Sequence, residues 1–247
     1  MTAARVTLLA LLATVGIEAA HAQPAPATPP PPVNPREAAP IDLTGQWVAI
    51  VNEDWRWRMV TPPKGDYASV PLNDEGRRVA DQWDPAQDGA CEAYGAAALM
   101  RMPTRLHITW EGDNILKIET DAGQQTRRLR FDRNAKPAGA RSLQGHSAAE
   151  WERPAGQGRG QTGPGGSLKV ITNNLRAGWL RKNGVPYSEN AVVTEYYDRL
   201  SAPNGDQWFT VTTIVEDPQY LSQPFVTSSH FKKEPDAAKW SPSPCTS

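Results

Sequence analysis

The order of apolar and polar residues along the chain predicts many short β-strands and few helices. Residues 105–110 alternate strictly, with Leu106, Ile108 and Trp110 on one face and polar side chains on the other. A period of two is typical of a strand that has one buried face. Similar patterns and apolar runs predict further strands at residues 46–51, 55–60, 115–120, 125–131, 147–152, 168–173, 192–200, 207–216 and 225–232.

Turn signals separate these strands. Asn204-Gly205 predicts one hairpin, and residues 111–114 predict another. The 23 prolines and 19 glycines agree with short strands joined by turns. A meander of this length has to hide its edge strands, and closure into a barrel is the usual way to do so. We therefore expect an all-β fold, a single antiparallel meander that closes into a β-barrel.

One short helix is expected beside the barrel, at residues 72–83. Asn73 or Asp74 can cap its start, and Val79 and Trp83 lie on the same helical face. No other segment has a comparable helical pattern, so we expect no helical crossovers and no parallel sheet of the kind that they connect.

The first residues have the features of a cleavable export signal. An apolar run at residues 6–17 follows a short positive region, and Ala20 and Ala22 give the small-x-small pattern that signal peptidase cuts. The run is too short to cross a bilayer core of about 30 Å. Residues 1–22 are therefore predicted to be a signal peptide cleaved near Ala22, which places the protein in the periplasm or outside the cell.

The remaining chain divides into three segments. Prolines dominate residues 23–40, which we expect to form a disordered tether, so that order begins near residue 41. Residues 41–235 form the predicted barrel domain, and residues 236–247 form a tail. In an oxidising compartment the two cysteines, Cys91 and Cys245, suggest one disulfide, although two free thiols remain the alternative.

Composition narrows the range of partners. The formal net charge of −1 gives no electrostatic reason to bind nucleic acid or an anionic membrane. The nine tryptophans favour a large apolar pocket or a platform for sugars. We therefore expect a small-molecule ligand, no nucleic acid, no membrane insertion and no cofactor. The oligomeric state stays open.

Two resemblances add to this interpretation. The segment at residues 43–47 contains Gly45 and Trp47 and resembles the Gly-x-Trp opening of lipocalins and related calycin barrels. In those proteins the Trp lies on the first strand and plugs the closed end of the barrel. The resemblance therefore implies a calycin-like (lipocalin-like) barrel.

The second resemblance covers roughly residues 102–231. The chain is similar there to a large set of exported bacterial proteins that have no assigned activity, which implies export but no reaction. It departs from their pattern in a Gly-rich insert after Glu152 and in having Tyr196 where they have Arg. The segments that carry the similarity are Gly145-His146-Ser147 with Trp151-Glu152, residues 168–172, 184–189, 193–197, and 213–218 with Tyr220 and Pro224.

Candidate catalytic residues are His146, Glu152 and Glu195. An imidazole beside a carboxylate is the usual acid–base arrangement near neutral pH, and His146 enters a strand that also carries Glu150 and Glu152. A structural role for His146 is the simpler alternative. The spacing of the histidines does not require a metal site.

Residues 193–199 mix polar and aromatic side chains on both faces, as expected where a barrel holds a polar ligand. A buried Glu195 would need a cationic partner, for which Arg128, Arg130 and Arg199 are the candidates; a purely structural ion pair is the alternative. The predicted ligand-binding residues are Arg130, Trp151, Tyr197, Arg199 and His230.

Two classes of function follow. The first is an exported barrel protein that binds a small amphipathic or aromatic molecule in its lumen. The alternative is a cofactor-independent enzyme, such as a hydratase, isomerase or lyase, with a His/Glu acid–base pair in the same cavity. A passive envelope module is a third possibility. The enzyme requires His146 and Glu195 to face one cavity, so their positions discriminate between the first two.

Overall fold

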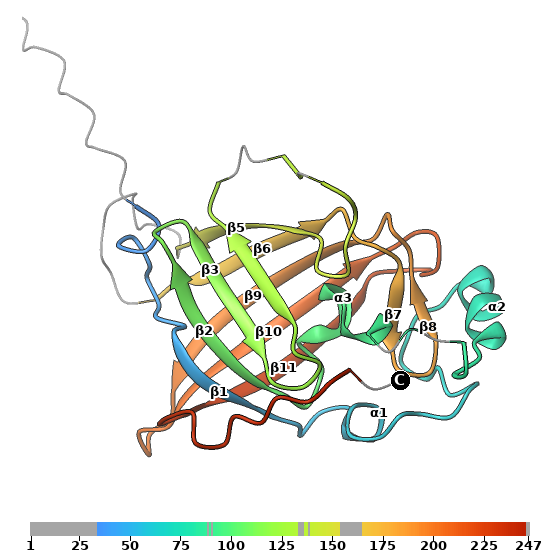
Figure 1. Cartoon of the computed structure of the whole chain (residues 1–247), viewed down its shortest axis with the longest axis horizontal. Coiled ribbons are helices and arrows are strands. Elements are labelled where there is room, and N and C mark those ends of the chain that lie inside the picture. Colours follow the sequence, from blue (N-terminus) through green and yellow to red (C-terminus); the bar gives the residue numbers. More distant parts are fainter. Residues whose placement is uncertain are drawn as a thin grey trace, which may run out of the picture. The chain divides into compact units, whose positions relative to one another are not determined.

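A closed β-barrel forms the body of the computed structural model, which describes residues 34–87, 89, 91–132, 136–137, 139–153 and 165–245. The predicted signal peptide and most of the predicted tether lie outside these residues. The fold is all-β, as expected (Figure 1). In the described chain nine strands close the wall: β1 (Gly45–Ile50), β2 (Arg105–Glu111), β3 (Ile115–Thr120), β4 (Thr126–Arg130), β5 (His146–Glu152), β6 (Ser167–Asn173), β9 (Val192–Ser201), β10 (Gln207–Glu216) and β11 (Phe225–Glu234).

The strand order around the wall is β1-β11-β10-β9-β6-β5-β4-β3-β2, and β2 closes back onto β1. The predicted hairpins are confirmed, since Ser201 pairs with Gln207 and Glu111 pairs with Ile115. One pair departs from a pure meander, because β4 and β5 run parallel. The chain between them therefore has to run back along the length of the barrel before β5 begins.

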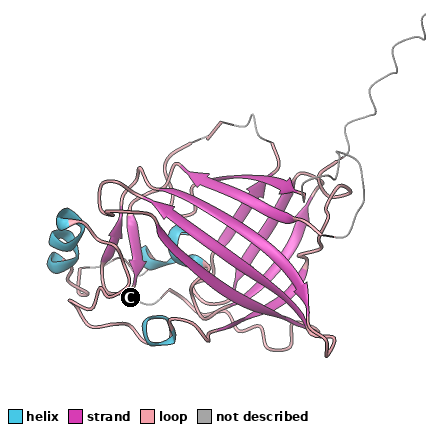
Figure 2. Cartoon of the chain, turned by 180° about the vertical axis from the view of Figure 1, so that it is seen from behind, coloured by secondary structure: helices cyan, strands magenta, loops and turns pink. Residues whose placement is uncertain are grey.

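The two ends of the barrel are covered differently (Figures 1 and 2). At the first end, which we call the tether end, residues 34–40 contact the strands. At the other end a plug is formed by elements outside the wall: α1 (Trp55–Arg58), α2 (Asp74–Gln82), η1 (Glu92–Tyr94), α3 (Ala96–Leu99), β7 (Gly178–Arg181) and β8 (Val185–Tyr187). The apolar residues of the plug form a second core that reaches the barrel strands through Val193, Val215 and Phe225.

The plug contains the main errors of the sequence prediction. The strand expected at residues 55–60 is the helical turn α1, which follows Asp54 in a left-handed conformation (φ 53°). The alternation of Trp and Arg is genuine, but the barrel is closed and offers no free edge for a further strand. The hairpin β7–β8 was not predicted. Its turn needs Gly184, which has φ +77° and lies where an added Cβ would be 2.1 Å from the Trp83 ring.

The predicted helix is confirmed as α2. The Asn73 side chain accepts a hydrogen bond from Gly76 N at 2.8 Å and also donates to Gln219 O at 3.1 Å, so the cap attaches α2 to the β10–β11 turn. In the same turn Asp217 accepts hydrogen bonds from the backbone N and the hydroxyl of Ser188, at 2.6 and 2.8 Å. Two of the segments noted in the sequence therefore hold the plug to the barrel.

The disulfide between Cys91 and Cys245 is formed and joins residues 154 positions apart. It attaches the C-terminal tail to the start of η1. The tail also pairs with the β3–β4 turn, since Ser243 N donates to Asp121 O at 3.0 Å and Gly123 N donates to Ser243 O at 3.0 Å.

We expect Cys245→Ser to lower the free energy of unfolding by about 2–4 kcal/mol, because the bond restricts the unfolded chain. Urea denaturation of the oxidised protein measures the loss. The reduced wild type should match the variant. A variant as stable as the oxidised wild type would show that the tail contributes nothing through this bond.

The tether is ordered earlier than predicted. Trp151 Nε1 donates to Pro35 O at 2.8 Å, and Arg153 Nη2 donates to Ala38 O at 2.7 Å. We therefore expect a chain that begins at Ile41 to be less stable than one that begins at Asn34, by about 1–2 kcal/mol for the lost hydrogen bonds. Thermal unfolding and tryptophan emission check this, and equal melting temperatures would contradict it.

Candidate functional site

Aromatic side chains fill the barrel interior toward the tether end. Trp47 is fully buried on β1, and its Nε1 donates to Leu43 O at 2.9 Å. Its ring lies edge-on to Phe209 with 4.7 Å between centroids, and Phe209 stacks on Phe231 at 4.8 Å. Trp47 therefore lies inside the barrel on the first strand. These rings occupy the volume in which a lumen ligand would lie.

Two of the predicted ligand-binding residues help to close the same end. Trp151 packs on Phe131 and Trp110, with centroids 5.1 and 6.5 Å away. Arg199 donates to Asp42 O and to Gln207 Oε1, both at 2.7 Å. Both side chains are thus engaged with the protein itself.

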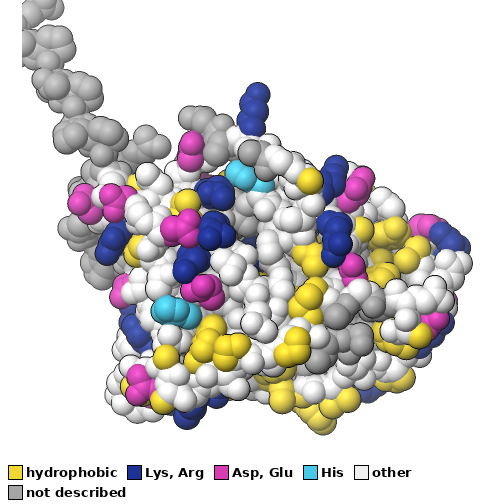
Figure 3. Space-filling model, in the orientation of Figure 1, with side chains coloured by type: hydrophobic (Ala, Val, Ile, Leu, Met, Phe, Trp, Pro, Cys, Tyr) yellow, Lys and Arg dark blue, Asp and Glu magenta, His cyan; other side chains and the backbone are white. Residues whose placement is uncertain are grey.

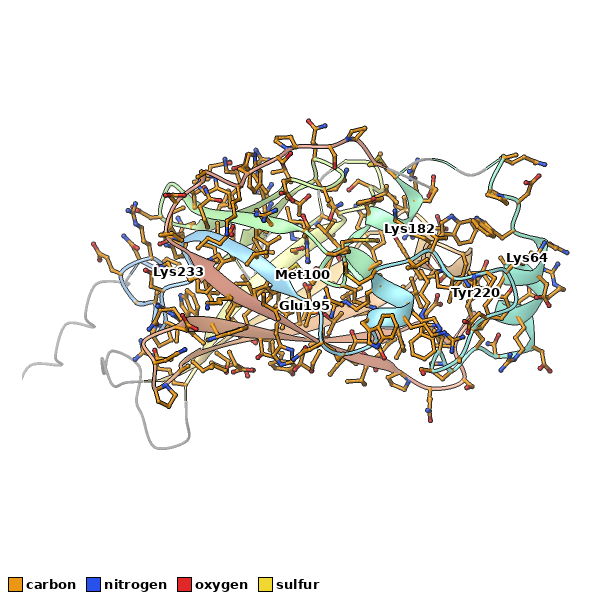
Figure 4. All side chains as sticks on the ribbon, turned by 90° about the horizontal axis from the view of Figure 1, so that it is seen from below. Lys64, Met100, Lys182, Glu195, Tyr220 and Lys233 are labelled. Atoms are coloured by element: carbon orange, nitrogen blue, oxygen red, sulfur yellow. A yellow bond between two sulfur atoms is a disulfide. The ribbon has the colours of Figure 1, made fainter. Side chains whose placement is uncertain are left out.

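Deeper in the barrel, Glu195 forms a buried ion pair. Arg127 donates to its two carboxylate oxygens at 2.9 and 2.6 Å, and both side chains are 0% exposed. The sequence prediction named Arg128, Arg130 or Arg199 as the partner and was wrong. On β4 the inward positions are 127 and 129, so Arg128 and Arg130 point outward. Figure 4 labels Glu195 among the strands, Lys233 toward the tether end and Lys182 toward the plug.

Hydroxyl groups complete this network. Arg127 Nη2 lies 3.3 Å from Thr172 Oγ1 and 3.5 Å from Ser147 Oγ, and the two hydroxyls are 2.7 Å apart. Burial alone would lower the pKa of Arg127, but the Glu195 carboxylate outweighs it and raises that pKa. Burial, and then the same carboxylate, raises the pKa of Tyr197. Arg127 therefore stays charged and Tyr197 stays protonated, which suits a structural role.

The predicted acid–base pair is not assembled. Ser147 points inward to Arg127, so its neighbour His146 lies on the outer face of β5 and Glu195 on the inner face of the wall. Glu152 also lies outside, with its carboxylate 3.3 Å from Lys169 Nζ. Among the described residues, His146 Nε2 has no hydrogen-bond partner.

The remaining candidates are also dispersed. Tyr197 is buried inside the barrel, next to Phe209. Arg130 lies on the outer face. His230 is also outside, and its Nδ1 is 3.1 Å from Glu53 Oε2, just before α1. The predicted set therefore does not form one site.

A cleft beside α1 combines apolar and cationic walls. It encloses about 220 Å³ and is bounded on one side by the tail. Figure 3 shows apolar side chains along the lower edge of the molecule, where Figure 1 places α1, and Trp55, Met59 and Val60 are 63, 56 and 64% exposed. The lining residues are Arg58, Met59, Val60, Thr61, Tyr94, Met102, Pro103, Ala122, Lys182, Ser243 and Pro244.

Three buried arginines lie behind this cleft. Arg58 donates through Nε to Arg101 O at 2.7 Å and pairs with Glu53. Arg101 donates through both Nη atoms to Asp54 Oδ2 at 3.1 Å. Burial lowers the pKa of both arginines.

Arg181 is the third arginine, and it is only 3% exposed. Among the described residues none of its three guanidinium nitrogens has a hydrogen-bond partner. The guanidinium lies over the Trp57 ring, 4.9 Å from the centroid. Burial, and then the charge of Arg101, lowers the pKa of Arg181 to about 10. Sequence reasoning missed it because β7 was not predicted; an Arg-Lys pair directly after the apolar Trp179-Leu180 was the available signal.

The described residues contain no group of three or more His, Cys, Asp or Glu side chains placed to hold a metal ion. None of their helices is long and apolar enough to span a bilayer.

The Arg127–Glu195 pair makes a prediction about stability. Glu195→Gln should lower the free energy of unfolding by about 3–5 kcal/mol, because it leaves a buried guanidinium without its counter-charge. Replacing both residues, with Arg127→Met and Glu195→Leu, should cost much less. The more exposed Glu152–Lys169 pair offers a control: Glu152→Gln should change the free energy of unfolding little. Urea denaturation measures all three, and a tolerated Glu195→Gln would disprove the assignment.

Comparison with known proteins gave no assignment. No protein-family model matches the chain. No curated protein matches it either.

Proposed function

We propose that this is an exported barrel protein that binds a small amphipathic molecule, and that it does so in the cleft beside α1. The observation that carries the proposal is the pairing of apolar and cationic walls around about 220 Å³. Ligand sites are commonly concave and largely apolar, with a few charged groups that fix the orientation of the ligand.

The packed interior is the reason for placing the ligand outside the lumen. Trp47, Tyr197, Phe209 and Phe231 are all fully buried between the strands. A ligand at that position would have to displace close-packed aromatic rings, which is costly in a protein core. The cleft, by contrast, needs no such rearrangement.

A groove extends the cleft along β1. It encloses about 490 Å³, and Met59 and Pro103 line both spaces. Val48, Ile50 and Trp55 add apolar surface to it. Contiguous exposed apolar surface of this kind is often a binding site. A ligand with a charged end and an apolar body fits the two spaces together.

Export is part of the proposal and is supported by the signal-like pattern of residues 1–22 and by the disulfide, which persists in oxidising compartments. The enzymatic alternative has no comparable support, because His146 and Glu195 lie on opposite faces of the wall. We therefore retain binding alone.

An uncharged fluorescent probe, N-phenyl-1-naphthylamine, tests the site. Met59→Ser should weaken its binding about five- to tenfold, because the substitution removes an apolar side chain shared by the cleft and the groove. Leu200→Ser is the matched control: Leu200 is 48% exposed at the tether end, and its loss should leave the affinity unchanged. Fluorescence titration measures both. Equal effects of the two substitutions, or no binding by the wild type, would overturn the proposal.

A further inference from the structure

We propose that Arg181 is an anion-binding residue at the inner end of the cleft and that it receives the carboxylate of a ligand with an apolar body. This inference depends on the proposed function and specifies the chemistry of its ligand. It begins from the unusual state of Arg181, which is 3% exposed while none of its nitrogens has a hydrogen-bond partner among the described residues. Buried guanidiniums normally have such partners, because burying an unpaired charge is costly.

The surrounding charges leave one positive charge unbalanced. Glu53 is paired with Arg58, and Asp54 with Arg101. Asp66, the other carboxylate near Arg181, is 2.6 Å from Arg56 Nη2. Three buried guanidiniums thus share two carboxylates, and a monoanion would restore the balance.

The shape of the site places that anion. Arg181 lines a recess of about 20 Å³, which Arg58, Val60, Met102 and Lys182 share with the larger cleft. A volume of about 10–15 Å³ is enough for one water-sized group. The recess can therefore take an oxygen of the ligand, while the rest of the ligand lies in the cleft and the groove.

Two further observations favour a carboxylate. Trp57 covers one face of the Arg181 guanidinium, so a planar carboxylate would approach the guanidinium along its edge, with one oxygen in the recess and the rest of the group in the cleft. Arg58 Nη2 is also buried without a hydrogen-bond partner in the described chain, and it lines the same recess. The donors at hand, together with the single unbalanced positive charge, thus match a flat monoanion better than a tetrahedral dianion.

A bound anion would offset the free-energy penalty of burying the Arg181 charge. Burial lowers its pKa to about 10, which means that the fold disfavours the charged form. A bound anion removes this penalty. Arg181→Met should consequently raise the melting temperature of the ligand-free protein while it weakens anion binding. If Arg181 were purely structural, its replacement would lower the melting temperature and leave anion binding unchanged.

The test compares decanoate with decanol, which share an apolar body and differ in the charged group. The wild type should bind decanoate at least about tenfold more tightly than decanol, as expected for a charge-assisted pair. Arg181→Met should bring this ratio close to one without changing the affinity for decanol. Arg78→Met is the control, since it removes an exposed cation on α2 and should leave both affinities unchanged. Calorimetric titration measures them.

Each other outcome is informative. If both probes bind the wild type equally, or if Arg181→Met keeps the ratio, the inference is wrong and the proposed function stands. If neither probe binds, the proposed function fails as well. If chloride raises the melting temperature of the wild type as much as decanoate does, the site holds an inorganic anion only and the carboxylate assignment is overturned. Should Arg181→Met fail to fold, this comparison and the ratio of the two wild-type affinities still decide, because both use the wild type alone.

Discussion

Closure of the sheet is the constraint on which the rest of the structure depends. Every strand of the wall pairs on both sides, so no edge is exposed, but a closed wall leaves two ends that have to be covered. At one end Trp151, which packs on Trp110 and Phe131, donates a hydrogen bond to Pro35 O. At the other the chain builds a plug that also surrounds a cleft. The candidate site is therefore a product of how the barrel is capped.

The buried Arg127–Glu195 pair and the Arg181 guanidinium show two ways of burying charge. The first is neutralised within the protein by direct contact at 2.6 Å, and both side chains are fully buried. The second lies against an aromatic ring and a recess. The physical difference lies in whether the protein supplies the counter-charge itself, and this separates a structural charge from one that is available to a ligand.

Sequence patterns predicted the wall well because its strands alternate with a fixed period and end at recognisable turns. In the plug they predicted α2 but missed the β7–β8 hairpin and α1, which has the same alternation as a strand and is helical for lack of a strand partner. The phase of β4 was also misjudged: Arg127, Arg128 and Arg130 look equivalent in the sequence, and only the register makes Arg127 internal. The recess at Arg181 joins α1, α3 and β7, three segments whose packing no local pattern reveals.

The covalent link at the tail has one further consequence. Ser243 and Pro244 form a wall of the cleft and directly precede Cys245. That wall is consequently held by a sulfur–sulfur bond in addition to a short backbone bridge. Wherever the two thiols remain reduced, the cleft loses the covalent anchor of this wall, so its complete formation depends on oxidation of the chain and not on folding of the barrel alone.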